Sequence, residues 1–379
     1  MYNFLLNCVD SNISIICDLI TPDIAASHNA ILDYFLCKKK DLCNKINALN
    51  DVKDLISRSE FNNCRASFAW IPRVGHYIIE YIEIEIGRQV IDTHYGEWLD
   101  IWNMLTLRDS KQVGYNKLIG DIPELTEYSA TVKPEYELLI PLQFWFCRNI
   151  GNCLPIIALN EMDIRLNVKF RDFNKLAIYE PFTDFRIKPR MQAKLIAEYL
   201  YVDQIERLQF AKNKLEYIID VLYYQNTIIN KNDITDTIYD TRIYFQNICK
   251  ELIWFIDRCD NDFIVPNRNI IRSSIRCNSQ LREAFKSNIY YNYVKPYECN
   301  NRSPEDGIMA YNFALFPENI QPSGGINLSG YENITITNDI DECTVRDIFK
   351  GIIYRMATYS LSCNILRIYA GVSALVFYS

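Results

Sequence analysis

The sequence predicts a mainly β protein built from two antiparallel β-sandwiches in tandem, preceded by a helical region. Beyond residue 60, apolar and polar residues alternate in many short segments, which is typical of strands with one buried face. These segments form two series joined by turns and long loops, without the alternation of strands and helices that a parallel sheet requires. Aromatic residues make up 13% of the 379 positions, and such rings favour half-buried sheet surfaces.

The N-terminal region, residues 1–60, differs from the rest of the chain. Between Asp23 and Ile56, apolar residues recur at helical spacing, with three lysines at 38–40 at an expected helix junction. We therefore expect a small helical region here. The first residues have no basic stretch before Asp10, so no signal peptide is predicted, and no segment has the ~18 apolar residues of a membrane span.

The first sandwich is expected over residues 61–229. Ile82, Ile84 and Ile86 alternate with glutamates, which predicts a strand with one wet face, and a tight turn follows at 87–89. Further strands are predicted at 138–146, at 164–170 and at about 195–203. A helix is predicted from Glu206 to Ile219.

One short helix is predicted within this first series, over residues 96–105. Trp98 and Trp102 lie on its apolar face together with Ile101 and Leu105. We expect the two tryptophans to anchor the helix to the first sandwich rather than to bind a ligand.

The second sandwich is expected over residues 241–379, after a polar linker at 230–240 that has no apolar face to bury. Its predicted strands are at 243–256, 311–315, 333–337, 364–368 and 374–377. Residues 258–310 are expected to form an irregular excursion. A turn before a strand is predicted at Pro322, Ser323 and Gly324, with Gly324 the residue that needs a positive φ.

Catalytic and cofactor motifs are absent from the sequence. The three histidines, His28, His76 and His94, contain no close pair of metal ligands, and His76 and His94 are expected to be hydrogen-bonding turn residues. The 13 cysteines include no CxxC pair, so most are expected to be small buried side chains. Nucleophile elbows and phosphate-binding glycine loops are also missing. We therefore predict no catalysis, no cofactor and no metal.

The charge of the chain argues against nucleic acid as a partner. A formal net charge of −7 gives no electrostatic attraction to phosphate backbones, so direct nucleic-acid binding is not predicted. Carboxylates such as Glu80, Glu83 and Glu85 are expected to form the solvated face of one strand. A pair of carboxylates assembled across strands, as glycosidases use, stays open as an alternative.

Six blocks of sequence carry a resemblance to a known family. The first two blocks are VGHYIIEYIEIEIGRQVIDTHYGEWLDIWNML (74–105) and PLQFWFCRNIGNCLPIIALNEMDIRLNVKFR (141–171). The third is YLYVDQIERLQFAKNKLEYII (199–219). The last three are KELIWFID (250–257), YNFALFPENIQPSGGINLSGYENITI (311–336) and NILRIYAGVSALVFYS (364–379). Together these blocks resemble the major capsid proteins of nucleocytoplasmic large DNA viruses. The resemblance covers residues 70–379, with the blocks in the family's order.

The resemblance implies a double jelly roll, that is, two eight-stranded sandwiches side by side. It implies that three copies form a pseudo-hexagonal capsomer and that capsomers tile an icosahedral shell over an internal membrane. The expected partners are further copies of the chain and minor capsid proteins, in virions assembled in the host cytoplasm.

Residues 1–60 depart from the glycine-rich start usual in the family. This departure leaves open a minor or penton-associated capsid paralogue as an alternative to the main shell subunit. A jelly-roll virion protein that binds or hydrolyses carbohydrate is a second alternative.

Overall fold

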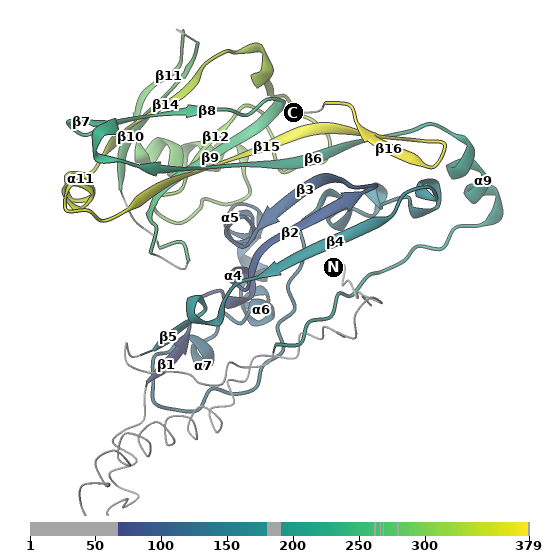
Figure 1. The fold of residues 1–379 in the computed structure, drawn as a ribbon, viewed down its shortest axis with the longest axis horizontal. Coiled ribbons are helices and arrows are strands. Elements are labelled where there is room, and N and C mark those ends of the chain that lie inside the picture. Colours follow the sequence, from purple (N-terminus) through teal and green to yellow (C-terminus); the bar gives the residue numbers. More distant parts are fainter. Residues whose placement is uncertain are drawn as a thin grey trace, which may run out of the picture. The chain divides into compact units, whose positions relative to one another are not determined.

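The structure, a computed structural model, describes residues 67–179, 191–260, 263–265, 267, 269–278 and 280–377. The predicted helical region at 1–60 lies outside the described residues. The described part is mainly β with short helices, as predicted (Figure 1). It divides into two compact units: unit 1 takes its described residues from Met1–Ile78, Val113–Pro141 and Arg171–Tyr199, and unit 2 from Ile79–Gln112, Leu142–Phe170 and Leu200–Ser379. Both units combine separate stretches of chain, and the predicted sandwich boundaries stay a prediction.

Unit 1 is the smaller unit and contains one short antiparallel pair. β1 (Phe68–Trp70) pairs with β5 (Ala177–Tyr179). Its other elements are α4 (Val74–Tyr77), α7 (Pro123–Thr126), η3 (Phe173–Lys175) and the part of α6 (Asp109–Ile119) from Val113 on. Gly75 of α4 lies against α6, where a Cβ would stand 2.8 Å from the backbone of Ile119, so only glycine allows this approach.

The predicted strand at 138–146 is wrong. Leu139 donates its backbone N–H to the carbonyl of Leu118, 2.8 Å away, which joins this stretch to α6 rather than to a sheet. Pro141 has no N–H for a ladder. The last residues of the predicted strand form the start of α8 (Trp145–Arg148).

A three-stranded sheet in unit 2 has the order β3-β2-β4, with β2 (Ile79–Ile86), β3 (Gln89–Tyr95) and β4 (Ile164–Phe170). The strands predicted at 82–86 and 164–170 are confirmed. Gly87 and Arg88 both have positive φ, +58° and +70°, which suits the tight turn between twisted strands. The glutamates of β2 are hydrogen-bonded across the sheet, since Asn167 donates to both Glu83 and Glu85.

A six-stranded sheet is built around β15 (Tyr354–Tyr369). One edge of β15 pairs with β6 (Leu215–Ile229) over fifteen rows and the other edge pairs with β9 (Ile248–Arg258) (Figure 1). The sheet is completed by β12 (Met309–Asn312), β13 (Ile326–Asn327) and β16 (Val372–Leu375).

The predicted helix from Glu206 to Ile219 is only half right. α9 spans Gln204–Lys212, and β6 begins three residues later. The run from Tyr217 to Val221 is rich in β-branched and aromatic residues, which pack well on a pleated surface. The strand predicted at about 195–203 is also wrong, because residues 191–203 take part in no described ladder.

A five-stranded sheet has the order β11-β10-β14-β8-β7. Its strands are β7 (Ile234–Thr235), β8 (Ile238–Ile243), β10 (Ile270–Cys277), β11 (Gln280–Ser287) and β14 (Ile334–Ile340). Residues 230–240 thus contain η4 (Lys231–Asp233), β7 and the start of β8. The expectation of an irregular stretch at 258–310 is wrong, because β10 and β11 belong to this sheet and are followed by η5 (Tyr290–Val294) and α10 (Lys295–Cys299).

The remaining short helices of unit 2 lie in loops between strands, as predicted. They are α5 (Gly96–Thr106), η1 (Ile150–Asn152), η2 (Ile156–Leu159), η6 (Leu328–Gly330) and α11 (Glu342–Phe349). Each of the five strands predicted for the second series overlaps an observed strand, β9, β12, β14, β15 and β16, with shifted bounds.

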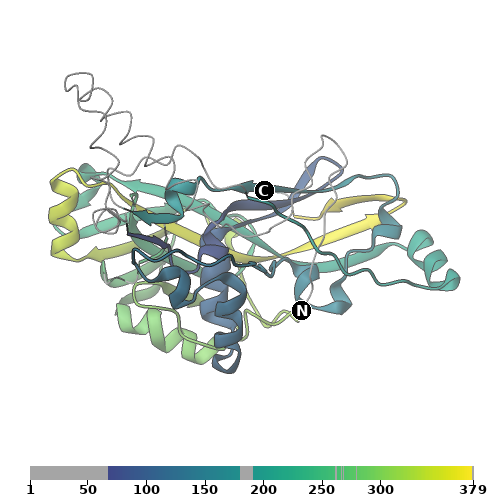
Figure 2. The same cartoon turned by 90° about the horizontal axis from the view of Figure 1, so that it is seen from below.

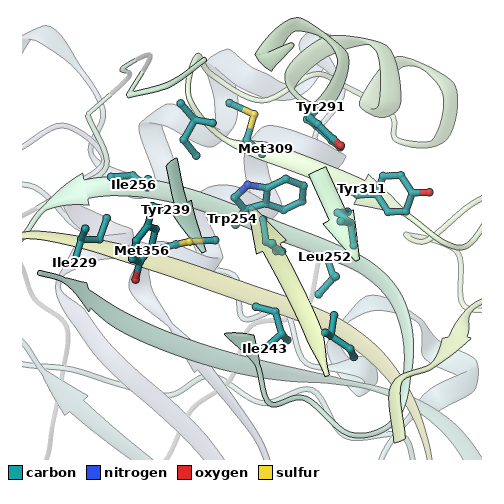
Figure 3. Packing of buried hydrophobic residues seen from close by; sticks show 14 of the residues in the cluster. Ile229, Tyr239, Ile243, Leu252, Trp254, Ile256, Tyr291, Met309, Tyr311 and Met356 are labelled. Atoms are coloured by element: carbon teal, nitrogen blue, oxygen red, sulfur yellow. The ribbon is translucent and has the colours of Figure 1, made fainter. Parts of the chain in front are cut away.

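The apolar core of unit 2 lies between the five-stranded and six-stranded sheets (Figure 3). Trp254 of β9 is at its centre, with Met356 of β15 and Met309 of β12 around it. The Trp254 indole donates to the Asn338 side chain of β14 over 3.2 Å, so its polar atom is satisfied inside the core. Each large apolar side chain buried here stabilises the unit by about 1.5–3 kcal/mol.

Candidate functional site

The face of β15 opposite this core holds a second buried group of side chains, which we call the joint cluster. It consists of Glu97, Trp98, Trp102, Arg148, Asp220, Tyr224, Lys250, Arg355 and Tyr359, all in unit 2. These residues come from α5, α8, β6, β9 and β15, so the cluster joins elements up to 262 positions apart in the chain.

Trp98 and Trp102 are both buried in α5, at 0% and 6% exposure. Their rings lie 5.8 Å apart, and Trp98 also lies 5.7 Å from the ring of Tyr359 in β15. Every residue from Gly96 to Leu105 is buried, so α5 is enclosed on all sides and not only along its predicted apolar face. Trp98 therefore packs against a strand near the C-terminus of the chain as well as against its neighbours.

An ion pair stands beside the tryptophans. Arg355 of β15 pairs with Glu97 of α5, and Tyr359 donates a hydrogen bond to the same carboxylate over 2.9 Å. Arg355 also donates to the hydroxyl of Tyr224 over 3.2 Å. Burial, followed by the charge of Glu97, raises the pKa of Tyr224 to about 12 and that of Tyr359 well above its ordinary value. Both phenols therefore stay neutral, with Tyr359 donating to Glu97 and Tyr224 accepting from Arg355.

A second charged chain runs from Trp102 to β9. The Arg148 guanidinium lies 3.8 Å from the centre of the Trp102 ring and pairs with Asp220 over 3.2 Å. Asp220 also accepts from the Lys250 ammonium over 2.9 Å, and that lysine is fully buried. One carboxylate thus holds two cations, an arrangement that stabilises the packing only while all three charges are present.

A β-bulge explains how Lys250 reaches Asp220. In the β9–β15 ladder, Ser362 pairs with Cys249 and Leu361 with Glu251, so Lys250 has no partner in β15. The extra residue lets a side chain leave the regular alternation of the strand. The backbone carbonyl of Lys250 accepts from two residues beyond β12, Phe313 and Ala314.

The predicted turn at Pro322, Ser323 and Gly324 lies just before β13, where Pro322 is exposed. The Ser323 hydroxyl accepts from the Phe316 N–H over 2.8 Å and donates to its carbonyl over 3.1 Å, which closes the loop between them. Gly324 has φ +124°, a conformation that other residues rarely adopt. Within the loop, the Asn319 carbonyl accepts from Lys250, so the turn is connected to the joint cluster through that lysine.

The histidines within the described residues are buried side chains of regular elements and not turn residues as predicted. His76 lies in α4 and shares a hydrogen bond of 2.9 Å with the Tyr115 hydroxyl. His94 lies in β3, 3.0 Å from Asp92, with its ring stacked on Phe144. Asp92 also accepts from the backbone of β6. His28 lies outside the described residues.

The described cysteines are free thiols. Burial raises the pKa of Cys147 and of Cys249 to about 12 and that of Cys363 to about 11, which keeps these thiols protonated and unreactive. Cys259 and Cys343 are exposed, in contrast to the general expectation. Cys8 and Cys17 lie outside the described residues.

Glu251 in β9 is a buried carboxyl group. It is 1% exposed and lies opposite Asn312 of β12 in the ladder. Asn300 donates to its Oε1 over 3.1 Å, while Glu251 Oε2 and Asn312 Oδ1 have no partner among the described residues. Burial raises the pKa of the Glu251 carboxyl to about 8. Burial therefore favours the neutral, protonated form of the Glu251 carboxyl group.

Among the described residues, no group of three or more histidine, cysteine, aspartate or glutamate side chains is placed to hold a metal ion. In the same part of the chain, none of the helices combines the length and the apolar character needed to cross a bilayer. The charged side chains of the joint cluster are at most 15% exposed and are paired with one another.

Two family models match the chain in tandem. The model for the N-terminus of major capsid proteins matches residues 39–203, and the model for the major capsid protein of large eukaryotic DNA viruses matches residues 206–374. The chain is also 30% identical to the major capsid protein of Pyramimonas orientalis virus over 334 residues, which cover 80% of this chain and 77% of that one. The chain belongs to the major capsid protein family of large DNA viruses. Members of this family are structural proteins.

Other relatives align over most of their length. The major capsid protein of Phaeocystis pouchetii virus is 25% identical over 434 residues, covering 81% of this chain and 82% of the relative. Probable capsid protein 4 of Acanthamoeba polyphaga mimivirus is 23% identical over 463 residues, covering 91% of this chain and 88% of the relative.

Solved structures show the fold. The PBCV-1 VP54 structure fitted into a reconstruction of the virophage Sputnik superposes with a TM-score of 0.71 at 21% identity, covering 83% of this chain and 87% of that one. The Faustovirus major capsid protein gives a TM-score of 0.61 at 11% identity, covering 80% and 74%. The fold is therefore a double jelly roll, as the resemblance implied. The joint cluster contains residues from both family-model regions, which sequence reasoning did not foresee.

The sequence pointed to only part of the joint cluster. Trp98 and Trp102 were singled out by helical spacing, whereas Asp220 and Arg355 carry no motif. One signal for Asp220 was present, because a single carboxylate in the apolar run from Tyr217 to Tyr224 needs a buried cation.

Proposed function

We propose that this chain is a shell subunit of a large icosahedral DNA virus and that three copies form a pseudo-hexagonal capsomer. The observation that carries the proposal is the double jelly-roll fold, matched over 83% of the chain at a TM-score of 0.71. Two similar sandwiches per chain give a trimer six sandwiches, so the trimer approximates sixfold symmetry and packs hexagonally.

The joint cluster supports a structural role within that subunit. Its ion pairs and rings connect α5 and α8 to the strands β6, β9 and β15. Buried, mutually satisfied networks of this kind make a protein interior rigid. A shell subunit needs such rigidity because it must present the same surfaces at every contact.

The proposed partners are further copies of the chain, neighbouring capsomers and minor capsid proteins, with an internal membrane beneath the shell and assembly in the host cytoplasm. We propose neither catalysis nor a cofactor. No direct contact with nucleic acid is proposed, since the net charge of −7 disfavours it.

Sedimentation and electron microscopy of the purified full-length chain test this proposal. We expect trimers of about three times 44.5 kDa that form hexagonal arrays or shells. A chain that stays monomeric at every concentration and salt tested contradicts the proposal. A reducing-sugar assay and a glycan array are expected to be negative, and a positive result favours the carbohydrate-active alternative.

A minor capsid paralogue is a second candidate, favoured by the sequence of residues 1–60, which departs from the glycine-rich start usual in the family. Both roles use the same fold and differ in abundance. Quantitative mass spectrometry of virions distinguishes them, since a main shell subunit dominates the virion protein and a minor one does not.

A further inference from the structure

We propose that α9 and its flanking residues dock on an acidic loop of a second copy of this chain. The α9 arm is residues 200–214 of unit 2, and the acidic loop is residues 124–137 of unit 1. The inference rests on the proposed self-association and names the surfaces that make one of its contacts.

The α9 arm exposes apolar side chains that the described part of the chain does not cover. No residue of α9 is buried. Tyr201 is 89% exposed, Ile205 68% and Leu208 50%. Three large apolar side chains this exposed within eight residues mark a contact surface, because single exposed apolar residues are usually scattered. Figures 1 and 2 show α9 at one end of β6, outside the stacked sheets of unit 2.

The helix holds its shape by local bonds. Asp203 accepts from the Glu206 N–H over 2.8 Å, and the Glu206 carboxylate accepts from the Asp203 N–H, which together form a capping box. A short helix without buried residues is marginal on its own, so the capping box keeps the arm ordered before it meets a partner. An ordered arm loses less conformational entropy on binding.

The charge of the arm follows its apolar side chains. Arg207, Lys212 and Lys214 are exposed and give the C-terminal half of the arm a positive charge. Lys214 is paired with Glu216 over 2.8 Å, so Arg207 and Lys212 are the cations assigned to the contact. The whole chain has a formal charge of −7. Copies of such a chain repel one another overall, so a contact between them needs opposite charges placed locally.

The acidic loop has the complementary character. Four exposed glutamates lie on it, and two apolar side chains, Tyr128 and Val132, are 49% and 70% exposed. The glutamates are Glu124, Glu127, Glu135 and Glu137. The loop therefore offers negative charge around apolar side chains, which matches the positive and apolar α9 arm.

The acidic loop is also held in a defined shape. Its one lysine, Lys133, is buried and donates to the Glu127 carbonyl and to the Ser129 hydroxyl. Ser129 in turn forms a backbone bridge with Phe68 of β1. Lys133 thus stabilises the loop from inside and interacts electrostatically with Glu127, and the four glutamates still leave the loop with a negative charge.

A contact between two different patches is a head-to-tail contact. When each copy is rotated by the same angle relative to the previous one, such contacts form a closed ring if a whole number of rotations makes 360°. A rotation of 120° gives a ring of three copies. The occupant of the α9 arm is therefore a second copy of this chain, and each copy uses both patches once.

Charge exchange in the full-length chain tests this assignment. In the arm variant Arg207→Glu/Lys212→Glu, we expect the dissociation constant of the oligomer, measured by mass photometry across a dilution series, to rise at least tenfold. In the loop variant Glu124→Lys/Glu127→Lys/Glu135→Lys, we expect a similar rise. A chain carrying both sets is expected to recover assembly, because the opposite charges meet again.

The matched control is Arg276→Glu/Lys286→Glu, two exposed cations on β10 and β11 with the same change in charge. An equal loss of assembly in this control overturns the inference, as does an arm variant that assembles like the wild type. Failure of the combined chain to recover overturns the choice of the acidic loop. Leu208→Ser, which changes no charge, is expected to weaken assembly as well.

Two further outcomes separate this inference from the proposed function. A wild-type chain that never assembles contradicts the proposed function itself. Binding of the wild-type chain to vesicles with 30% anionic lipid that is lost in the arm variant, with assembly unchanged, assigns the arm to a membrane and overturns the contact between copies.

Discussion

β15 has two buried faces, and the chain fills them in different ways. On one face, Tyr354 and Met356 pack into the apolar core around Trp254. On the other, Arg355 and Tyr359 belong to the joint cluster, with charges paired across several strands and helices. Apolar packing tolerates exchange of similar side chains, whereas a buried ion network fails when one member is lost. The joint cluster should therefore be the more sensitive of the two faces.

The largest expected effect comes from breaking the ion pair of the joint cluster. Arg355→Met leaves Glu97 buried without its cation, which should cost about 3–5 kcal/mol of unfolding free energy. Urea denaturation followed by circular dichroism measures this. Arg367→Met is the matched control, because its pair with Glu216 is about half exposed and solvent screening leaves such a pair little effect on stability. Equal losses in both variants contradict the distinction between the faces.

The next effect is expected from the two tryptophans of α5, which belong to the joint cluster. Trp102→Ala removes a side chain that is 6% exposed and packs against the Arg148 guanidinium. We expect the free energy of unfolding to fall by about 3 kcal/mol. Trp98 is 0% exposed, so Trp98→Ala should lower the free energy of unfolding by about 3–5 kcal/mol. Tyr297→Ala, at 86% exposure, is the control and should leave the melting temperature unchanged. A wild-type melting curve for Trp102→Ala removes this assignment.

Glu251 can be compared with Glu97, since both are buried carboxyl groups and only Glu97 is paired with an arginine among the described residues. Its pKa is about 8 in the folded chain against an ordinary 4.5, so the folded state binds the proton more tightly. The stability of the wild type should therefore fall as the pH rises from about 4.5 to about 8, and then level off. Glu251→Gln removes this pH dependence. Above pH 8 its free energy of unfolding should exceed that of the wild type by about 2–4 kcal/mol, and at pH 4 the two should be equal. Melting curves at a series of pH values test it, and a gain that does not vary with pH is the contrary result.

The smallest expected effect is at the turn linked to the joint cluster through Lys250. Gly324→Ala introduces a Cβ at φ +124° and should cost about 1–2 kcal/mol. Gly330→Ala is the matched control, since no atom lies within 4 Å of the added Cβ and its φ is not in the positive range. Urea midpoints of the two variants are compared, and similar values contradict the proposed role of Gly324.

Local patterns determined a large part of this protein. Alternation predicted β2 and β4 because a strand with one buried face repeats every two residues, and helical spacing predicted α5. The same rules failed at 138–146 and after Lys212. In the first case the backbone bonds to α6, and in the second the residues gain their ladder only from β15, which lies about 140 positions away.

The sequence by itself determined the order of the family's blocks, the mainly β composition and the two tryptophans on one helical face, since these depend on nearby residues. Only the tertiary structure decided which charges meet. Glu97 and Arg355 are 258 positions apart, and the bulge that turns Lys250 toward Asp220 exists only when β9 and β15 pair. Side-chain spacing along a chain carries information over a few residues, whereas a buried ion pair is selected by the folding of the whole unit.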